Sequence, residues 1–362
     1  MNCFLYESRE FEREFELLYF IGLGLEQSPS LGALEKLREC DKIYYESYTS
    51  PVINDNVLEE LSRALTDARF EVVKREFVED GRTILDTAKD SIVAIVCSGD
   101  PMIATTHQEL RTRAIRQGIQ TKIVHGSSVI AAIGGELGLH SYNFGRIVTM
   151  TSEPMQYTAY STIFRNLLQG LHSTVLFQWD ESTSFFLEPS NAVKSLLEAE
   201  ADLRNDVFGG DTLVLVVSRL GTDNTKLSSL SIDEMLTADL GKPPHAMVVP
   251  GKLHFTEKEA LGALFNKNPE SFRDNSENVI RISEKMVSKY SEKTMKALER
   301  AKLAAAKRGL KFADVFENVE CYTRDSQRFI NEGKEELAVL SIGYAEGLLD
   351  SLRFSGQLEF EW

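Results

Sequence analysis

The sequence has few cysteines, and those it has are not arranged to bind metal. They are isolated from one another, with no Cys-x-x-Cys pair and no histidine at zinc-ligand spacing: Cys3, Cys40, Cys97 and Cys321. Structural zinc is therefore not expected, and no metal site is predicted. Cys40 and Cys97 stand among apolar neighbours, which is typical of small core residues in a reducing compartment.

Long apolar runs are also missing, and a secretory leader is not expected. The longest apolar runs, such as Leu213 to Val217, are much shorter than a membrane-spanning helix. The first seventeen residues carry many charges, which excludes the apolar region of a signal peptide. These charges are Glu7, Arg9, Glu10, Glu12, Arg13, Glu14 and Glu16. We therefore expect a cytoplasmic protein without a membrane partner.

Positive charge is scarce relative to negative charge. Forty Lys and Arg residues stand against 55 Asp and Glu residues, which gives a formal net charge of -15. A nucleic-acid surface needs a basic face that displaces counterions, so nucleic acid is not an expected partner. The 362 residues, 43% of them hydrophobic, are enough to bury a full core and to form two or three domains.

From residue 17 to about residue 146, short β-branched or aliphatic runs alternate with helical segments. This rhythm predicts a mostly parallel sheet with helices on both faces. The expected strands are Leu18 to Leu23, Lys42 to Tyr45, Phe70 to Val73, Ile92 to Cys97 and Thr121 to Val124. The expected helices include Ser30 to Glu39, Asn56 to Ala68, Thr83 to Lys89 and Thr105 to Gln117.

The pattern changes twice further along the chain. Four strand candidates separated by longer polar segments predict a second α/β lobe with a mixed sheet: Arg146 to Thr151, Thr174 to Trp179, Thr212 to Ser218 and Ala246 to Val249. Three segments with helical spacing then predict an antiparallel bundle: Asn275 to Lys307, Phe312 to Ile330 and Glu335 to Leu352. The expected division is an N-terminal extension at 1–16, lobes at 17–143 and 144–268, and a helical extension at 269–362.

Residues 98–107 read Ser-Gly-Asp-Pro-Met-Ile-Ala-Thr-Thr-His, directly after an apolar strand. The chain must turn sharply there, because Gly99 permits positive φ and Pro101 fixes its own. Thr105 and Thr106 are expected to cap the helix that follows. Since ligands of open α/β sheets bind at the carboxyl ends of strands, this loop is a candidate site wall. The alternative is a simple turn with two capping threonines.

A second glycine-containing loop, Gly22-Leu-Gly-Leu, follows the first predicted strand. The dinucleotide fingerprint Gly-x-Gly-x-x-Gly would require glycine at position 27, where the chain has Gln27, so a Rossmann cofactor site is disfavoured. The two glycines would still let backbone groups approach a ligand closely, with Leu25 as an apolar contact. The structural alternative is a tight turn from strand to helix.

Several motifs together resemble the diphthine synthases, methyltransferases of diphthamide biosynthesis in the tetrapyrrole-methylase superfamily. They are Gly22-Leu-Gly-Leu, Tyr48-Thr49-Ser50, the Gly-Asp-Pro segment, His125-Gly-Ser-Ser-Val129, and Gly241 to His254, which reads GKPPHAMVVPGKLH. The resemblance covers about residues 17 to 265. The segment after about residue 270 is similar to a small archaeal helical domain of unknown function.

The resemblance implies a two-lobed α/β fold that binds S-adenosylmethionine in the cleft between the lobes. It carries cofactor contacts onto eight residues: Leu25, Asp100, Ile103, Ser128 and Val129 in the first lobe, and Gln178, Leu220 and His245 in the second. Relatives usually have an aliphatic residue before the acidic one in the segment around Gln178, so that contact could be shifted by one position. Methyl transfer from a sulfonium needs no metal or covalent nucleophile, and no catalytic residue is assigned.

His245 has a second interpretation. Pro243-Pro244 stiffens the approach to it, and a histidine could deprotonate the ammonium form of an acceptor near neutral pH. We favour the cofactor contact, because the resemblance supports it and solvent can remove the proton. His107 and His125 are expected to be loop-packing residues that hydrogen-bond to the backbone.

The function implied by the resemblance is methylation of a modified histidine of elongation factor 2. The methyl groups would go to the amino group of its aminocarboxypropyl side arm, giving the trimethylammonium product, and the family implies a homodimer. One alternative is a tetrapyrrole C-methylase with a broader pocket, and another is a binding protein of the same fold without catalysis. The sequence leaves open whether methylation also reaches the carboxylate, and what the N-terminal and helical extensions do.

Overall fold

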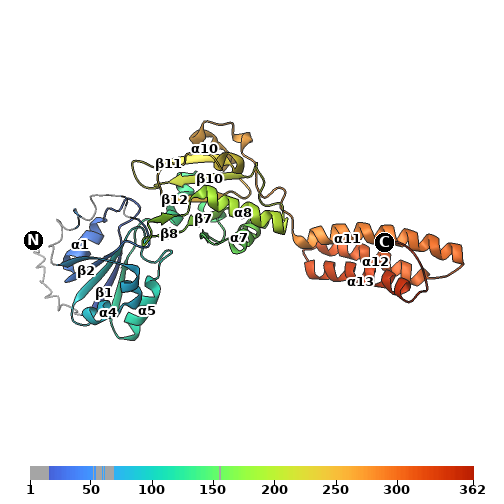
Figure 1. The fold of residues 1–362 in the computed structure, drawn as a ribbon, viewed down its shortest axis with the longest axis horizontal. Helices are drawn as coiled ribbons and strands as arrows, with labels where there is room; N and C mark the ends of the chain where they lie inside the picture. The colour runs from blue at the N-terminus through green and yellow to red at the C-terminus, as the bar shows by residue number, and fades with distance from the viewer. Residues whose placement is uncertain (1–15, 52, 54–58, 60, 62–68, 155) are drawn as a thin grey trace, which may run out of the picture. The chain divides into compact units, whose positions relative to one another are not determined.

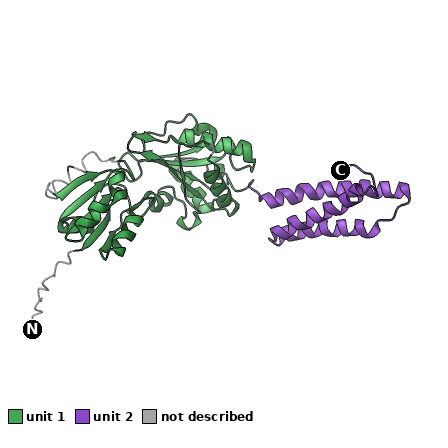
Figure 2. Ribbon diagram, turned by 60° about the horizontal axis from the view of Figure 1, so that its bottom comes forward, with its two compact units in different colours: residues 1–277 green, residues 278–362 purple. Residues whose placement is uncertain are grey.

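The computed structural model describes residues 16–51, 53, 59, 61, 69–154 and 156–362. The chain divides into two compact units, Met1–Glu277 and Asn278–Trp362, which Figure 2 shows in different colours. The first unit contains two α/β lobes, and the second consists of helices. Among the described residues, no helix is both long and apolar enough to cross a membrane.

The first lobe is built on a five-stranded parallel sheet (Figure 1). In spatial order its strands are β3 (Phe70–Val73), β2 (Lys42–Glu46), β4 (Ile92–Cys97), β1 (Leu17–Gly22) and β5 (Gln120–Val124). Strand β1 is buried along its whole length and pairs on both sides, with Leu18 opposite Val93 on β4 and Thr121 on β5. The predicted parallel sheet is confirmed, because β-branched and aliphatic runs suit strands covered on both faces.

Helices cover both faces of this sheet. Helix α1 (Leu31–Glu39) buries Ala33 and Leu37 against one face, whereas α3 (Arg75–Asp80), α4 (Arg82–Ala88) and α5 (His107–Arg116) pack on the other. Helix α6 (Val129–Glu136) and a 3-10 turn, η2 (Ser141–Asn143), lead to the second lobe. The helix expected at Asn56 to Ala68 and the extension at 1–16 fall almost entirely outside the described residues.

The second lobe has the mixed sheet that the sequence predicts. Its order is β11 (Lys226–Ser231), β10 (Leu213–Ser218), β12 (His245–Val249), β7 (Ser173–Phe177) and β6 (Val148–Met150), and only β6 and β7 pair in parallel. The serine-rich edge strand β11 was not predicted from the sequence. A two-stranded ribbon joins β8 (Trp179–Asp180) to β9 (Phe185–Phe186), and the helices are α7 (Tyr157–Leu168), α8 (Pro189–Leu203), α9 (Ile232–Met235) and α10 (Phe255–Phe265).

Residues 269–277 pack on the second lobe. After the 3-10 turn η3 (Pro269–Ser271), Phe272 is buried in the same core as β10, β12 and α10. The side chain of Asn275 accepts a hydrogen bond from the amide of Leu213 (2.9 Å) and donates to the carbonyls of Leu213 (2.8 Å) and Pro250 (2.9 Å). The helical unit therefore begins at Asn278, whereas the sequence-based division places the boundary at 268/269.

The helical unit is the predicted three-helix bundle. Its helices are α11 (Ile282–Arg308), α12 (Ala313–Asn331) and α13 (Glu335–Phe354). The two short connections contain the expected stop glycines, Gly309 with φ 64° and Gly333 with φ 71°. Its core is formed by one apolar side of each helix and includes Val287, Leu298, Val319, Ile342 and Leu349.

Candidate functional site

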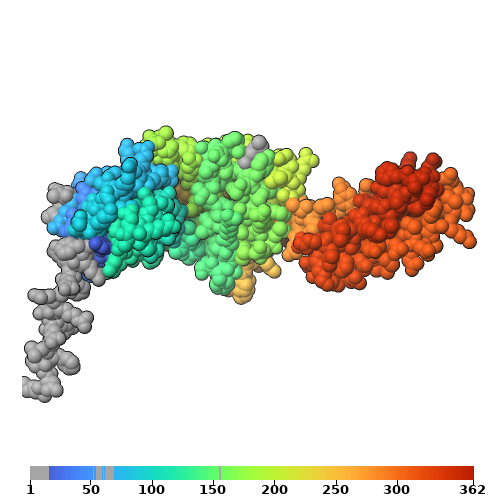
Figure 3. Space-filling model, turned by 90° about the horizontal axis from the view of Figure 1, so that it is seen from below, coloured from blue at the N-terminus to red at the C-terminus, as the bar shows by residue number. Residues whose placement is uncertain are grey.

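A cleft lies between the two lobes of the α/β unit, which lie side by side in Figures 1 and 3. It encloses about 1080 Å³, counting the part open to solvent. The first lobe lines it with the loops that follow β1, β2, β4 and β5, all at the carboxyl edge of the parallel sheet. This is the edge at which α/β sheets bind ligands. The second lobe lines it mainly with apolar side chains.

The glycines of the first-lobe loops allow these loops to interlock. Gly24 and Gly99 exchange two backbone hydrogen bonds, of 3.1 and 2.9 Å, and have φ angles of 77° and 72°. A Cβ atom on Gly22 would lie 2.3 Å from the carbonyl oxygen of Gly99, and one on Gly126 would meet the same oxygen at 2.3 Å. These close approaches are therefore between loop backbones, whereas the sequence-based interpretation expected a close approach to the ligand.

Asp100 braces this junction from a buried position. One carboxylate oxygen accepts the amide of Met102 at 2.8 Å, and the other lies 2.7 Å from Nδ1 of His125. Asp100 is 5% exposed, whereas the side chain of His125 is 68% exposed. The expectation that His125 packs in its loop and bonds to backbone is thus wrong in this structure. Its partner is the Asp100 carboxylate, which links the loops after β4 and β5.

The threonines before α5 do not cap it with their side chains. Thr106 occupies the N-cap position, but its hydroxyl hydrogen-bonds with the Tyr48 hydroxyl at 3.0 Å. The Thr105 hydroxyl donates to the carbonyl of Pro101 at 2.7 Å. Nδ1 of His107 lies 2.9 Å from that same carbonyl oxygen, so the expected bond between His107 and the backbone is confirmed. Thr105 and His107 thus stabilise the turn at Pro101, and neither threonine side chain caps the first turn of α5.

His245 begins β12 and lines the cleft. Its Nδ1 lies 2.8 Å from the Ser218 hydroxyl, and that hydroxyl donates to the Leu240 carbonyl at 2.7 Å. The hydroxyl hydrogen is thus committed to Leu240, so Nδ1 of His245 must carry the hydrogen of the first bond. Burial lowers the pKa of His245, which favours the neutral ring.

Seven of the eight predicted contact residues line this one cleft: Leu25, Asp100, Ile103, Ser128, Val129, Leu220 and His245. Gln178 is the exception. Its side-chain oxygen accepts the amide of Ser152 at 2.8 Å, outside the cleft. Its neighbours Phe177 and Trp179 line the cleft instead, because successive residues of an extended segment point to opposite sides.

Two groups of cleft residues were not identified from the sequence. Trp179 stacks on Phe186 across the β8–β9 ribbon, with ring centroids 4.2 Å apart, and both rings line the cleft. The buried Gln27 donates to Ser98 Oγ at 2.8 Å and to the Pro51 carbonyl at 2.7 Å. The alternation of residues after β7 could have indicated Trp179, whereas nothing near Gln27 in the sequence indicates its distant partners.

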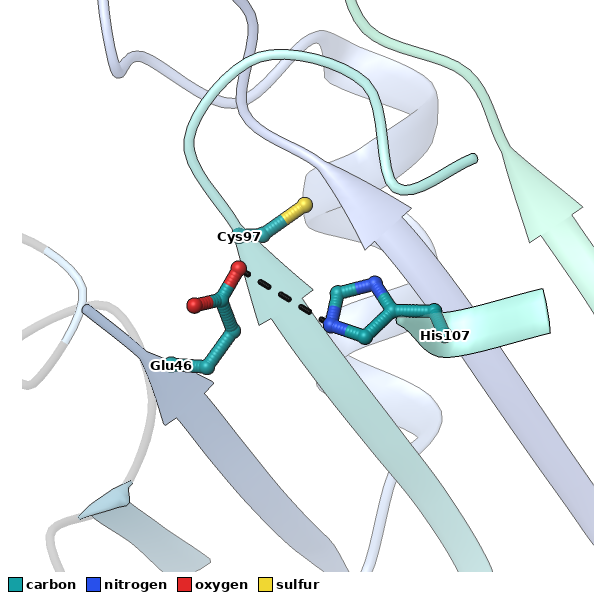
Figure 4. Close-up of side chains that lie close together, drawn as sticks. All are labelled: Glu46, Cys97 and His107. Atoms are coloured by element: carbon teal, nitrogen blue, oxygen red, sulfur yellow. Dashed lines mark ion pairs between the residues drawn. The ribbon is translucent and has the colours of Figure 1, made fainter. Parts of the chain in front are cut away.

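Beneath the cleft lies a buried polar cluster of Glu46, Cys97 and His107 (Figure 4). These come from the ends of β2 and β4 and the start of α5, and Glu46 Oε1 lies 3.8 Å from His107 Nε2. Burial raises the pKa of Glu46 to about 7, against the hydrogen bonds that Thr49 and Tyr48 donate, and lowers the pKa of His107 to about 4. Within the described part of the chain, this is the one group of three or more such side chains whose ligand-type atoms lie mutually within 4.8 Å.

Comparison with known proteins agrees with this architecture. The family of tetrapyrrole (corrin/porphyrin) methylases matches residues 17–236, which is more than half of the chain. A family described as a protein of unknown function (DUF357) matches residues 289–358, within the helical unit. The α/β unit is thus that of a tetrapyrrole methylase.

Individual relatives narrow this class. Diphthine synthase of Methanosarcina mazei is 37% identical over 272 residues, which cover 72% of this chain and 100% of the relative. That of Methanosphaera stadtmanae is 35% identical over 266 residues, covering 71% and 99%. A crystal structure of a diphthine synthase, 31% identical, superposes with a TM-score of 0.63 over 70% of this chain and 98% of its own. The chain belongs to the diphthine synthase family.

Proposed function

We propose that this protein uses S-adenosylmethionine to methylate the aminocarboxypropyl-modified histidine of elongation factor 2, as a step of diphthamide biosynthesis. The observation that carries the proposal is the single cleft that gathers seven of the eight residues expected to contact the cofactor. Membership of the diphthine synthase family supports the same reaction.

The chemistry of the donor fits a cleft of this composition. A sulfonium loses its positive charge as the methyl group leaves, so a site partly shielded from water favours the transfer. Leu25, Val129 and Leu220 supply apolar surface, and the turn braced by Asp100 supplies backbone polar groups that can fix the ends of the cofactor. The eight predicted residues remain proposed contacts.

The acceptor needs only an uncharged amine aligned behind the methyl carbon, and this positioning supplies much of the rate. A neutral His245 places no added positive charge beside the sulfonium, which suits a cofactor contact. We propose that three transfers to the same nitrogen give the trimethylammonium product.

We further propose that the enzyme works in the cytoplasm as a homodimer. Light scattering that gives a monomer mass at every concentration would refute the dimer.

One experiment tests the reaction. The full chain is incubated with methyl-labelled S-adenosylmethionine and with elongation factor 2 that carries the aminocarboxypropyl-histidine, and the label is located by mass spectrometry. We expect up to three methyl groups on the side-arm nitrogen and none on elongation factor 2 with unmodified histidine. A parallel incubation replaces elongation factor 2 by a tetrapyrrole precursor, and label there would indicate the C-methylase alternative. Cofactor binding measured by calorimetry, without transfer to either acceptor, would indicate a binding protein.

A further inference from the structure

The buried Glu46, Cys97 and His107 cluster lies under two loops that line the cleft. Glu46 is 1% exposed, and Cys97 and His107 are 0% exposed. One loop, residues 47–51, follows β2, and the other, residues 98–104, follows β4. Figure 4 shows the Glu46 carboxylate and the His107 ring pointing toward each other beside the end of β4. The cluster does not itself line the cleft.

Each member of the Glu46 and His107 pair holds one of these loops. Oε2 of Glu46 accepts the amides of Tyr48 at 3.0 Å and Thr49 at 2.9 Å, which fixes the start of the first loop. His107 Nδ1 holds the Pro101 carbonyl at 2.9 Å in the second loop. Thr49 and the Asp100 next to Pro101 are both lining residues of the cleft.

The buried Glu46 and His107 pair needs one more hydrogen than the hydrogen bonds of the two residues account for. A carbonyl can only accept, so His107 Nδ1 carries the hydrogen of its bond to Pro101, and the neutral ring presents a lone pair at Nε2. Glu46 Oε1 faces that lone pair at 3.8 Å, which is longer than a hydrogen bond. Neither atom has a hydrogen-bond partner within the described parts of the chain. Two buried acceptors that face each other are costly unless one of them carries a proton.

We propose that Glu46 and His107 are positioning residues, that one buried proton is carried on Glu46 and directed at His107, and that this pair couples the loops at 47–51 and 98–104 into one cofactor-binding wall. The proposal rests on the proposed function for the identity of the ligand. It assigns no contact with cofactor or acceptor to either residue.

A proton fits this cluster better than a metal ion does. Zinc would need the Cys97 thiolate as a ligand beside the nitrogen and the oxygen. Burial raises the pKa of Cys97 well above the ordinary value, which favours the neutral thiol. With a protonated carboxyl, a neutral ring and a thiol, the cluster carries no net charge, which burial requires.

The surroundings place the proton on Glu46. Its raised pKa lies near neutrality, whereas the lowered pKa of His107 keeps the ring neutral. The ionisable groups that act on the carboxyl are Tyr45 and Tyr48 from its own chain segment, Cys97 and His107 from β4 and α5, and Glu181 from the β8–β9 ribbon. Glu181 also accepts the Ser47 hydroxyl at 2.6 Å, so the second lobe contacts this loop as well.

Three single variants separate the roles. Glu46→Gln keeps an oxygen for the amides of Tyr48 and Thr49 and offers a permanent N–H to His107, so it imitates the protonated carboxyl. His107→Phe keeps the ring volume and loses both nitrogens. Cys97→Ser is the matched control, because it lies in the same cluster and holds neither loop. The full chain is used throughout, and S-adenosylmethionine affinity is measured by titration calorimetry.

We expect His107→Phe to weaken S-adenosylmethionine binding about tenfold, because the buried bond to Pro101 and the acceptor for the Glu46 proton are lost. Glu46→Gln and Cys97→Ser should stay within about twofold of the parent at pH 6. Amide exchange without cofactor should become faster in both loops of His107→Phe and stay unchanged in Glu46→Gln. Combining Glu46→Gln with His107→Phe should be non-additive, because the residues act as a pair.

The pH profile gives a readout that a merely structural role would not move. A carboxyl whose pKa is raised on folding stabilises the fold fully below its unfolded value near 4.5, and this contribution is lost as the pH rises to about 7. Parent stability should therefore decline between pH 4.5 and about 7 and level off above that, and parent affinity should decline as the pH rises above about 7. Glu46→Gln should flatten both declines, because its side chain cannot ionise.

The outcomes are distinct. Unchanged affinity and loop exchange in His107→Phe would overturn the proposal, as would a Glu46→Gln variant that binds as weakly as His107→Phe. One equivalent of tightly bound metal, present in the purified parent and lost in Cys97→Ser, would overturn the buried proton in favour of a metal site. If the parent itself does not bind S-adenosylmethionine, the proposed function fails, and the exchange measurements still decide on the pair.

Discussion

The two lobes build the cleft in different ways. The first lobe uses loops at the carboxyl ends of parallel strands, and these loops are held by backbone bonds, tight glycines and buried polar side chains. The second lobe uses side chains on or beside its strands, such as Phe177, Trp179, Val217 and Ala246. The wall formed by the first lobe (the first wall) is therefore defined by backbone geometry. The wall formed by the second lobe (the second wall) is defined by the shape of its apolar side chains. Substitutions in the first wall should be tolerated least.

The largest effect is expected at the glycine junction. In Gly22→Ala the new Cβ would lie 2.3 Å from the Gly99 carbonyl, and backbone at that distance cannot move aside cheaply. We expect the free energy of unfolding of the α/β unit to fall by about 3 kcal/mol and cofactor binding to be lost. Thermal unfolding and calorimetry measure both.

The control for this prediction is Gly32→Ala in the same lobe. Nothing lies within 4 Å of a Cβ at Gly32, which is in helix α1, so stability should stay equal or rise by up to about 1 kcal/mol. Equal behaviour of the two variants would contradict the importance of the glycine junction.

Asp100→Ala should have the next largest effect. It removes the acceptor of the Met102 amide and the partner of His125 without breaking the sheet. Loss of a charged hydrogen bond corresponds to about ten- to a hundredfold weaker S-adenosylmethionine binding. Asp100→Asn, which keeps an oxygen for the amide, should lose less. Full affinity for S-adenosylmethionine in a folded Asp100→Ala variant would show that Asp100 has no role in cofactor binding.

His245→Asn tests the second wall. As a cofactor contact, it should raise the half-saturating concentration of S-adenosylmethionine about fivefold and leave the pH dependence of saturated turnover as in the parent. An obligatory base would instead lower saturated turnover by about a hundredfold or more and remove the acidic limb of the profile. Steady-state kinetics over a pH series distinguishes the two, and a collapse of turnover with unchanged affinity contradicts our assignment.

The smallest effect should come from removing the helical unit. A chain that ends at Glu277 should keep cofactor affinity and methyl transfer, because all lining residues of the cleft lie before that point. A chain that ends at Asn268 should be less stable by about 2 kcal/mol or more, since it loses the buried Phe272. Thermal unfolding of the two truncated chains makes the comparison. Loss of binding at Glu277 in a folded protein would show that the helices contribute to the site.

The first wall could be predicted from the sequence largely because strand ends and turn residues are local signals. Gly99, Asp100 and Pro101 stand directly after an apolar run, so their place at a sheet edge follows from the pattern. Gln178 was placed one residue from the cleft, because a single sequence does not reveal which residues of an extended segment face a partner lobe. Trp179 was missed together with this placement, although the alternation implies that residues 177 and 179 face the same side.

Contacts between distant segments could not be predicted. Glu46 and His107 belong to different elements and meet only because β2 and β4 are neighbours in the sheet, with α5 beginning beside them. The end of the α/β unit was placed early because residues 269–277 lack periodicity. Their attachment depends on Phe272 and on the Asn275 side chain bonding to the backbone of β10.

Strand β1 has a consequence for slow motions of the protein. It is buried at every position and is hydrogen-bonded to a neighbour on each side. Amides in such a strand exchange with deuterium only when the whole lobe opens, so those of Leu18 and Phe20 should be among the last to be labelled. The Gly22–Leu25 turn is tethered to this persistent strand. When the cleft opens and closes, we therefore expect the aromatic side chains on its opposite side to move more than this turn.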